Sequence, residues 1–361
     1  MARNSRRAAL TFTTTCAGVW WVAVTVVILG CRQPGSDTPA SRNDATPSVV
    51  VYCSADKEFA ELVFSAYEKK TGVKVLPLYD TEETKTAGLT ARLVAEKARP
   101  KADVFWSSDT SRAVALVDQA LAAAYVPKSA AEIPARYKSP DGLWTGFGAR
   151  IRVLLYNTDR VKPDEAPRSI LDLTRLRWKG RFAIANPHFG TMSFQAAALF
   201  VKWGDDKASD FLRQLKGNGA VIAAGNSDVK DRVADGRVDV GILDEDDAMV
   251  AVREKKPVAI AIPDQEGSDP LGTPLMPNVA LLIQRAPHVE QAQRFIDFLV
   301  SADAEKILAE SDAAQYPLHA GVTGPKQLPP LASIRAMDVD YLEVARRLPS
   351  MDASVRNIFG L

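Results

Sequence analysis

The sequence predicts an α/β protein with two lobes, on the strength of three observations. Short apolar runs rich in β-branched residues alternate with segments of helical periodicity, which is the pattern of strand–helix–strand units around a parallel sheet. The chain has 361 residues, enough for two lobes that each bury a core. Hydrophobic residues make up 47% of the chain and charged residues 25%, which excludes a disordered or a multispan membrane protein.

The first thirty residues predict an export signal. Three arginines precede an acid-free apolar run over 17–30. A run of about 14 residues is short for a membrane span, which needs roughly 20, but it suits a secretory signal. Gly30 before Cys31 resembles the cleavage site of bacterial lipoproteins. We therefore expect a lipoprotein signal peptide at 1–30 and a lipidated Cys31; a plain anchor helix is the alternative.

Residues 31–48 predict a disordered tether between the lipid and the folded body. They contain three prolines among small polar residues, and Val, Ile, Leu and aromatic side chains are missing. Cys16 lies in the signal and Cys31 would carry lipid, so Cys53 stands alone. A disulfide framework and a site of several cysteines are thereby excluded, and Cys53 is expected to be a small buried hydrophobe.

The folded body opens with two strand–helix–strand units. The run at 49–52 predicts a strand, and the spacing of Phe59, Leu62, Val63 and Tyr67 predicts a helix over 56–71. A strand at 73–79, a helix at 86–98 and a strand at 102–106 follow by the same criteria. These strands are expected to be parallel.

The alternation resumes after residue 150, without any internal repeat. Further strands are predicted at 151–157, 182–185, 220–223, 238–243, 258–262 and 279–283, and helices at 193–203, 228–235 and 288–299. Prolines interrupt the chain after residue 324, before a last helical pattern at 338–348.

The overall charge restricts the class of partner. With 45 Lys and Arg against 44 Asp and Glu, the chain is nearly neutral. It has no basic stripe with interleaved aromatic residues, so nucleic acid is not expected as a partner. Ligands of open α/β sheets bind beyond the carboxyl ends of the strands, and polar segments follow five of the predicted strands. These segments are 53–56, 107–109, 186–193, 225–227 and 244–247.

Motifs spread over most of the chain carry a resemblance to a known family. They include the segment from Phe64 to Val75, the strand at 102–106, Asn157-Thr158-Asp159, Gly225-Asn226-Ser227 and Tyr316-Pro317-Leu318. On these the sequence resembles the extracellular solute-binding proteins of ABC importers, particularly the ferric-ion-binding group. The resemblance implies the two-lobed type II periplasmic-binding-protein fold, with a mixed, mostly parallel sheet in each lobe and a hinge between them. It places lobe 1 at 49–150 and about 275–312, lobe 2 at about 151–274, and a C-terminal segment at about 313–361 that packs back on the lobes.

The resemblance also implies a set of cation ligands, with one departure from the family. The Tyr-Tyr pair of the ferric-binding group falls on Asp246 and Asp247, and its other ligand positions fall on Asp56 and on Ser108 or Asp109. If these carboxylates converge, they suit calcium, manganese or iron, or an organic cation such as an amine. The alternative is that the run 244–247 is simply a solvated loop and helix N-terminus, where acids are favoured.

A second part of the site is predicted for an anion. In the resembling family a synergistic anion, such as carbonate or phosphate, lies where Gly190, Thr191 and Ser193 open a helix here, close to the position of Asn226. Helix capping alone would also explain the two hydroxyls. Further ligand-contacting candidates are Ser227 and Asp244. Arg150 and Arg152 suit either a carboxylate or phosphate ligand or hinge salt bridges.

The three histidines lack the short spacing of a zinc site. A surface or loop position is expected for His288 and His319, while His188 lies within a predicted ligand loop.

Together these features predict a monomeric, lipid-anchored receptor on the periplasmic side of the cell envelope. It would capture a metal ion, iron(III) foremost, by lobe closure and deliver it to the permease and ATPase subunits of an ABC importer. The alternatives are a receptor for a small organic solute (a phosphonate, polyamine or thiamine-like molecule) and a sensory protein without a permease. No catalytic motif is present, so an enzyme and an enzymatic cofactor are not expected.

Overall fold

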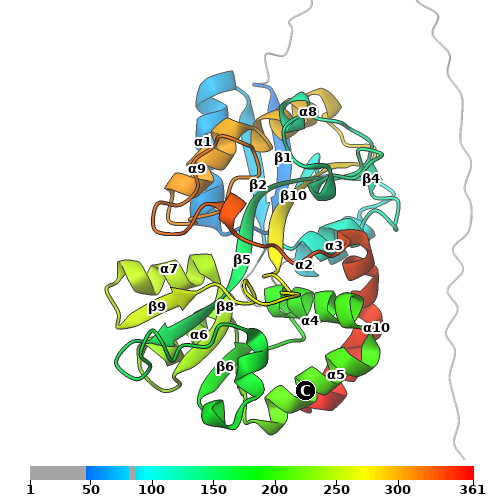
Figure 1. Ribbon diagram of the computed structural model, residues 1–361. Coiled ribbons are helices and arrows are strands. Elements are labelled where there is room, and N and C mark those ends of the chain that lie inside the picture. The colour runs from blue at the N-terminus through cyan, green and yellow to red at the C-terminus, as the bar shows by residue number, and fades with distance from the viewer. Residues whose placement is uncertain (1–45, 81–86) are drawn as a thin grey trace, which may run out of the picture. The chain divides into compact units, whose positions relative to one another are not determined.

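A computed structural model describes residues 46–80 and 87–361 (Figure 1). The predicted signal peptide, Cys31 and most of the predicted tether lie outside the described residues. Within the described residues, no helix is both long enough and apolar enough to cross a membrane.

The first lobe is built around the predicted strand–helix–strand units. Its elements are β1 (Ser48–Cys53), α1 (Lys57–Thr71), β2 (Lys74–Tyr79), α2 (Ala87–Ala95), β3 (Val104–Ser107), α3 (Thr110–Ala115) and β4 (Ala122–Ala123). Strand β1 pairs in parallel with both β2 and β3, as expected. Helix α1 buries Ala60, Val63, Phe64 and Tyr67 on one face and ends at Gly72, whose φ of 72° is the left-handed conformation that glycine adopts readily.

The second lobe repeats the parallel arrangement. Its elements are β6 (Phe182–Ala185), α4 (Gly190–Trp203), α5 (Asp205–Gly217), β7 (Val221–Ala223), α6 (Asn226–Ala234), β8 (Val240–Asp244), α7 (Glu245–Arg253) and β9 (Val258–Ala261). Strand β6 pairs in parallel with β7 and β8.

Two long strands join the lobes. Strand β5 (Thr145–Asn157) pairs antiparallel with β10 (Leu275–Ile283) up to Ile151, and with β8 from Arg152 onward. The sheet order is therefore β2-β1-β3-β10-β5-β8-β6-β7, with β4 beside β10 and β9 beside β5. Parallel pairs lie toward both ends, and the antiparallel pairs involve the crossing strands.

The chain ends with three helices, α8 (Val289–Leu299), α9 (Ala302–Glu310) and α10 (Tyr341–Phe359). Helices α8 and α9 pack on the first lobe, whereas α10 contacts α3 of the first lobe and α4 and α5 of the second (Figure 1). The sequence predicted that the last helix stops near residue 348, but it continues through Pro349. The added turns bury Met351, Val355 and Phe359, which offsets the cost of an interior proline.

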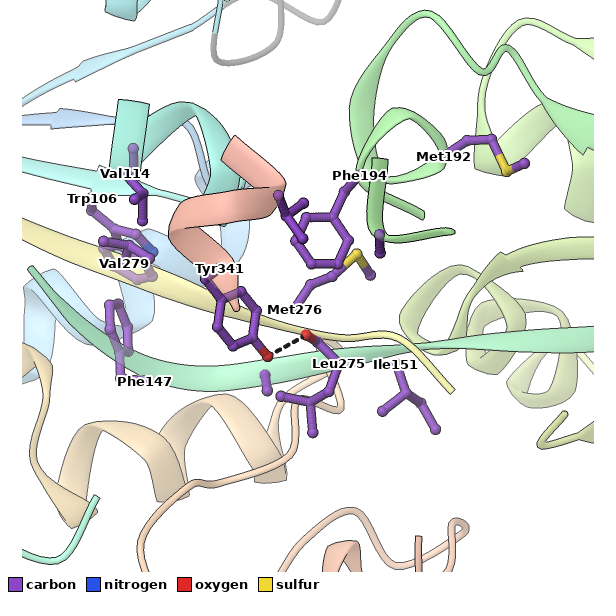
Figure 2. Packing of buried hydrophobic residues seen from close by; sticks show 14 of the residues in the cluster. Trp106, Val114, Phe147, Ile151, Met192, Phe194, Leu275, Met276, Val279 and Tyr341 are labelled. Carbon is purple, nitrogen blue, oxygen red and sulfur yellow. Dashed lines mark hydrogen bonds between the residues drawn. The ribbon is translucent and has the colours of Figure 1, made fainter. Parts of the chain in front are cut away.

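Aromatic packing connects the crossing strands to α10 (Figure 2). Trp106 of β3 meets Phe147 of β5 at a ring separation of 5.4 Å. Tyr341, the first residue of α10, stacks on Phe194 of α4 at 6.0 Å and donates a hydrogen bond to the carbonyl oxygen of Leu275 at 2.7 Å. This core therefore contacts both lobes and the C-terminal helix.

Helices α3, α5 and α9 were not predicted from the sequence, and α7 was expected only through the alternative of a helix N-terminus at 244–247. Helix α5 could have been predicted from its sequence pattern. Its buried apolar residues are spaced as on one helix face: Ala208, Phe211, Leu212 and Leu215. Helix α3 has six residues, too short for a periodic pattern to stand out, whereas α7 and α9, with nine residues each, are no shorter than α2 and α6, which the sequence did predict.

Candidate functional site

The candidate site lies where β5 changes partner from β10 to β8. Arg150 and Arg152 flank this change and, being two residues apart, project to the same face of the strand. Asp244, the last residue of β8, is the cross-strand partner of Arg152. Two arginines from β5 are thereby placed against the predicted acidic run.

Asp244 is wholly buried and accepts hydrogen bonds from three side chains. Its Oδ1 lies 2.7 Å from a guanidinium nitrogen of Arg152, and its Oδ2 lies 3.0 Å from Asn226 Nδ2 and 3.3 Å from Arg150. A buried carboxylate is tolerated because its charge is paired and its oxygens are satisfied.

Arg152 is also wholly buried, and every nitrogen of its guanidinium donates a hydrogen bond. Besides Asp244, it donates to Gln195 (3.0 Å), Thr191 (3.1 Å) and the side-chain oxygen Oδ1 of Asn226 (3.0 Å). Side chains from α4 and α6 are thus drawn toward β5. Gln195 was missed by the sequence analysis, since a glutamine inside a helix gives no pattern of its own.

Arg150 connects the two lobes. Its guanidinium donates to the carbonyl oxygen of Ser108 in the first lobe at 2.5 Å and lies 3.8 Å from Asp246 in the second. Burial alone would lower the pKa of Arg150, but the Asp244, Asp246 and Glu245 carboxylates outweigh it and raise that pKa. The guanidinium is therefore a fixed positive charge between the lobes.

Asp246 and Asp247 begin α7 together with Glu245. One carboxylate oxygen from each of Asp244, Asp246 and Asp247 lies within 4.8 Å of the others. Burial raises the pKa of Asp246 to about 7; Arg150 opposes the rise, and Asp247 and Asp244 add to it. Ser227 Oγ donates to Asp247 at 2.7 Å. The acidic run does form a helix N-terminus, but Asp244 and Glu245 are buried rather than solvated.

Glu245 was part of the predicted acidic run but not singled out as a site residue. Its Oε2 accepts the backbone N–H of Ile151 at 2.6 Å, which ties α7 to the crossing strand. Burial and the neighbouring Asp246 and Asp244 carboxylates raise its pKa well above the usual range. Among the described residues, neither its Oε1 nor the buried phenol oxygen of Tyr316 has a hydrogen-bond partner.

The predicted first-lobe residues take different positions. Ser108 faces Arg150 through its carbonyl oxygen, and its hydroxyl donates to the Ser54 carbonyl at 2.9 Å. Asp109 caps α3, and its carboxylate accepts hydrogen bonds from Arg112 N (3.1 Å) and Ser111 Oγ (2.7 Å). This carboxylate therefore stabilises the N-terminus of the helix. Asp56 precedes α1, and its charge is among those that raise the pKa of Arg150.

Some of the residues predicted to hold an anion form hydrogen bonds with one another. Ser193 Oγ donates to the Gly190 carbonyl at 2.7 Å, within the first turn of α4. Thr191 Oγ1 accepts from Arg152 and from Asn226, each at 3.1 Å. The structure brings Asn226 onto Asp244 and Thr191 onto Arg152 and Asn226, while Ser193 bonds within its own helix.

Comparison with known proteins establishes the class of protein. Residues 99–344 match the family model described as bacterial extracellular solute-binding protein. The chain belongs to this family. This solute-binding protein is 30% identical over 304 residues to iron uptake protein A1 of Synechocystis, covering 80% of this chain and 79% of the relative. It is 28% identical over 308 residues to the Fe(3+)-binding periplasmic protein of Serratia marcescens, covering 84% and 89%.

Solved structures show the same relationship. Iron-bound HitA from Pseudomonas aeruginosa superposes with a TM-score of 0.76 at 25% identity, over 86% of this chain and 99% of that one. The Trichodesmium protein IdiA (FutA), in complex with iron and citrate ligands, gives the same TM-score, identity and coverage. These matches confirm the predicted two-lobed α/β fold and the likeness to the ferric-iron group. The family consists of binding proteins, so the prediction that this solute-binding protein is not an enzyme is also confirmed.

The remaining residues singled out in the sequence of this solute-binding protein are His188, Cys53 and His319, and each is packed or hydrogen-bonded within the fold. His188 pairs with Asp352 of α10, and Cys53 is buried as predicted. His319 lies in a loop, as expected, but it is buried there, with Nδ1 2.8 Å from Glu305 and Nε2 2.7 Å from the Ser129 carbonyl. The buried Glu305 carboxylate draws it inward, a partner that sequence spacing could not reveal.

Proposed function

We propose that this protein is the lipid-anchored substrate-binding component of a bacterial ABC importer and captures a metal ion, iron(III) foremost. Its relatives include proteins named for iron uptake and Fe(3+) binding. Cys31 carries the lipid in this proposal, and the permease and ATPase subunits are the partners that receive the ion. The protein works as a monomer on the periplasmic side of the envelope.

The convergence of Asp244, Asp246 and Asp247 within 4.8 Å carries the proposal. Carboxylate oxygens are hard ligands that suit iron(III), manganese and calcium. Burial, to which the Asp247 and Asp244 carboxylates add, raises the pKa of Asp246 to about 7 against the opposing charge of Arg150, which reflects the cost of holding negative charge there. A bound cation relieves that cost, so the strain of the acidic cluster favours ligand binding.

Closure of the lobes completes the site in this proposal. We take the lobes as 49–150 with 275–312 and as 151–274, joined by the crossing strands. Asp56 and Ser108 lie on the first-lobe side of Arg150, and Asp246 and Asp247 on the second-lobe side. A cation held by Asp246 and Asp247 then gains first-lobe ligands only when the lobes meet, which favours the closed form for delivery.

Metal titration of the tag-free mature chain tests this proposal. The chain is stripped of metal and titrated with ferric, ferrous, manganese and calcium ions, and the Asp246→Ala, Asp247→Ala double variant is compared with wild type. We expect saturable binding at one ion per chain, lost in the double variant. The matched control is Asp206→Ala with Asp269→Ala, two exposed acids outside the site, which should bind like wild type. Absence of binding by every ion would contradict the metal proposal.

Cys31→Ser tests the anchor separately. If Cys31 carries lipid, the wild-type protein fractionates with membranes and the variant does not. Equal fractionation of both proteins would contradict lipid anchoring.

A second candidate ligand is a small organic cation. The guanidinium of Arg150 lies 3.3 Å from Asp244 and 3.8 Å from Asp246, which shows that these carboxylates accommodate a nitrogen cation. Polyamines and thiamine-like amines are therefore included in the same titration. Binding of an amine without any metal binding would favour this candidate.

A further inference from the structure

The donors around Asp244 form a complete anion-binding set. Arg152 and Arg150 come from β5, and Asn226 comes from the first turn of α6; all three direct N–H groups at the same carboxylate, at 2.7, 3.3 and 3.0 Å. Thr191 accepts hydrogen bonds from Arg152 and Asn226 and thereby fixes the direction of both donors. Guanidinium and amide groups that converge in this way recognise carboxylate, carbonate or phosphate oxygens.

The acceptor in this set belongs to the chain itself. Asp244 and Arg152 are both wholly buried, and they neutralise each other across the two strands. An additional anion would meet donors of Arg152 and Asn226 that are already engaged; on Arg150, the buried Nε alone has no hydrogen-bond partner among the described residues. It would also lie near the carboxylates of Asp244, Asp246 and Asp247, which repel it.

We propose that the Asp244 carboxylate is a built-in anion that fills the anion-binding part of the site, so that ligand binding needs no external carbonate or phosphate. The proposal rests on the proposed function for the identity of the ligand, and it assigns different roles within the acidic run. Asp244 orients Arg152, Asn226 and Arg150 as a positioning residue, and Asp246 and Asp247 face the cation. The sequence-based expectation of a synergistic anion at Thr191 and Asn226 is replaced by a carboxylate from the chain.

Anion binding to metal-free protein tests the inference without relying on metal binding. Thermal unfolding is followed at constant ionic strength while chloride is exchanged for formate, bicarbonate or phosphate. Wild type should show no saturable stabilisation by these anions beyond their general salt effect. Asp244→Ala should unfold at a lower temperature, and formate or bicarbonate should restore part of the loss with a saturable dose response, because a small anion takes the place of the missing carboxylate.

Two controls identify the donors. Arg152→Met combined with Asp244→Ala removes the main donor with the acceptor, so the anions should no longer stabilise the protein. Asp103→Ala removes another wholly buried carboxylate, which pairs with His288 instead of an arginine, and the anions should not rescue it.

The anion measurements on wild type test the inference even if Asp244→Ala does not fold. Saturable binding of bicarbonate or phosphate to metal-free wild type would overturn the inference. An increase of about tenfold or more in wild-type metal affinity on adding bicarbonate would also overturn it. Failure of every metal to bind would contradict the proposed function alone, because the anion measurements contain no metal.

Discussion

At the scale of single residues, buried charges determine how strongly the site can bind a cation. The guanidinium of Arg150 stands 3.8 Å from Asp246, so any cation that reaches this carboxylate meets a positive charge already in place. Both side chains are only 13% exposed, which keeps their interaction from being fully screened by water. Arg150 is therefore both a link between the lobes and a competitor of the ligand.

Removing this competing charge should raise the affinity for cations. We expect Arg150→Gln to bind manganese or calcium about tenfold more tightly than wild type, which corresponds to about 1.4 kcal/mol of relieved repulsion. Arg150→Lys keeps the charge and should bind like wild type within about threefold. Isothermal titration of the three proteins checks this. A loss of affinity in Arg150→Gln would mean that Arg150 organises the carboxylates more than it opposes the ligand.

Asp264, outside the site, links protonation to stability. Burial raises its pKa from 3.8 to about 6, while hydrogen bonds from Ser169 and Ile170 oppose the rise. The folded protein holds this proton more tightly than the unfolded chain does. The stability gained from the proton is therefore complete below pH 3.8 and is lost as the pH rises through about 6.

Asp264→Asn should remove this loss of stability. Its amide resembles the protonated acid, and asparagine tolerates the φ of 62° at this position. We expect the variant to exceed wild type in free energy of unfolding by about 2 kcal/mol near pH 7.5, with the difference vanishing near pH 4. Urea denaturation at both pH values measures it, and Asp269→Asn, at an exposed position, is the control. A difference that does not change with pH would show that proton linkage is not the cause.

At the scale of the elements, regular patterns were predictable and pairings between distant residues were not. The strands β1, β2 and β6 appear at or within one residue of their predicted positions, because β-branched and apolar runs report burial directly. The sequence also placed polar candidates at strand ends, where Asp244 and Asn226 do meet. It could not show that Arg152 faces Asp244, since that contact depends on the register between β5 and β8.

The contact between β8 and α6 is tight enough to require glycine at position 241. A Cβ atom there would overlap Cγ1 of Val229 and lie 3.0 Å from Cγ2 of Val233. We expect Gly241→Ala to lower the free energy of unfolding by about 1 to 3 kcal/mol. Gly217→Ala at the end of α5, where nothing lies within 4 Å of the added atom, should be neutral or gain up to about 1 kcal/mol. Chemical denaturation compares them, and equal stabilities would mean that β8 and α6 separate easily.

At the scale of the whole folded body, α10 ties the two lobes together. Arg346 binds Asp118 of the first lobe with two contacts of 2.9 Å. One residue on, Arg347 pairs with Asp205 of α5, and further along Asp352 pairs with His188 before α4. In the proposed opening and closure, the lobes would therefore have to break the contacts of α10 with one lobe as well as bend at β5 and β10.

Reversing one of these contacts should shift the ligand-free protein toward open forms. Arg346→Asp places two acids opposite each other, and spin labels at Lys57→Cys and Lys256→Cys, on the two lobes, report the separation. We expect a broader distribution with longer distances, and cation affinity lowered by up to about fivefold, because the pair is exposed and its interaction is screened by water. Adding Asp118→Arg restores opposite charges and should restore both values, whereas Arg213→Ala, which breaks an ion pair within α5, should change neither. An unchanged distribution in Arg346→Asp would mean that α10 moves with the second lobe and slides over the first without restraining it.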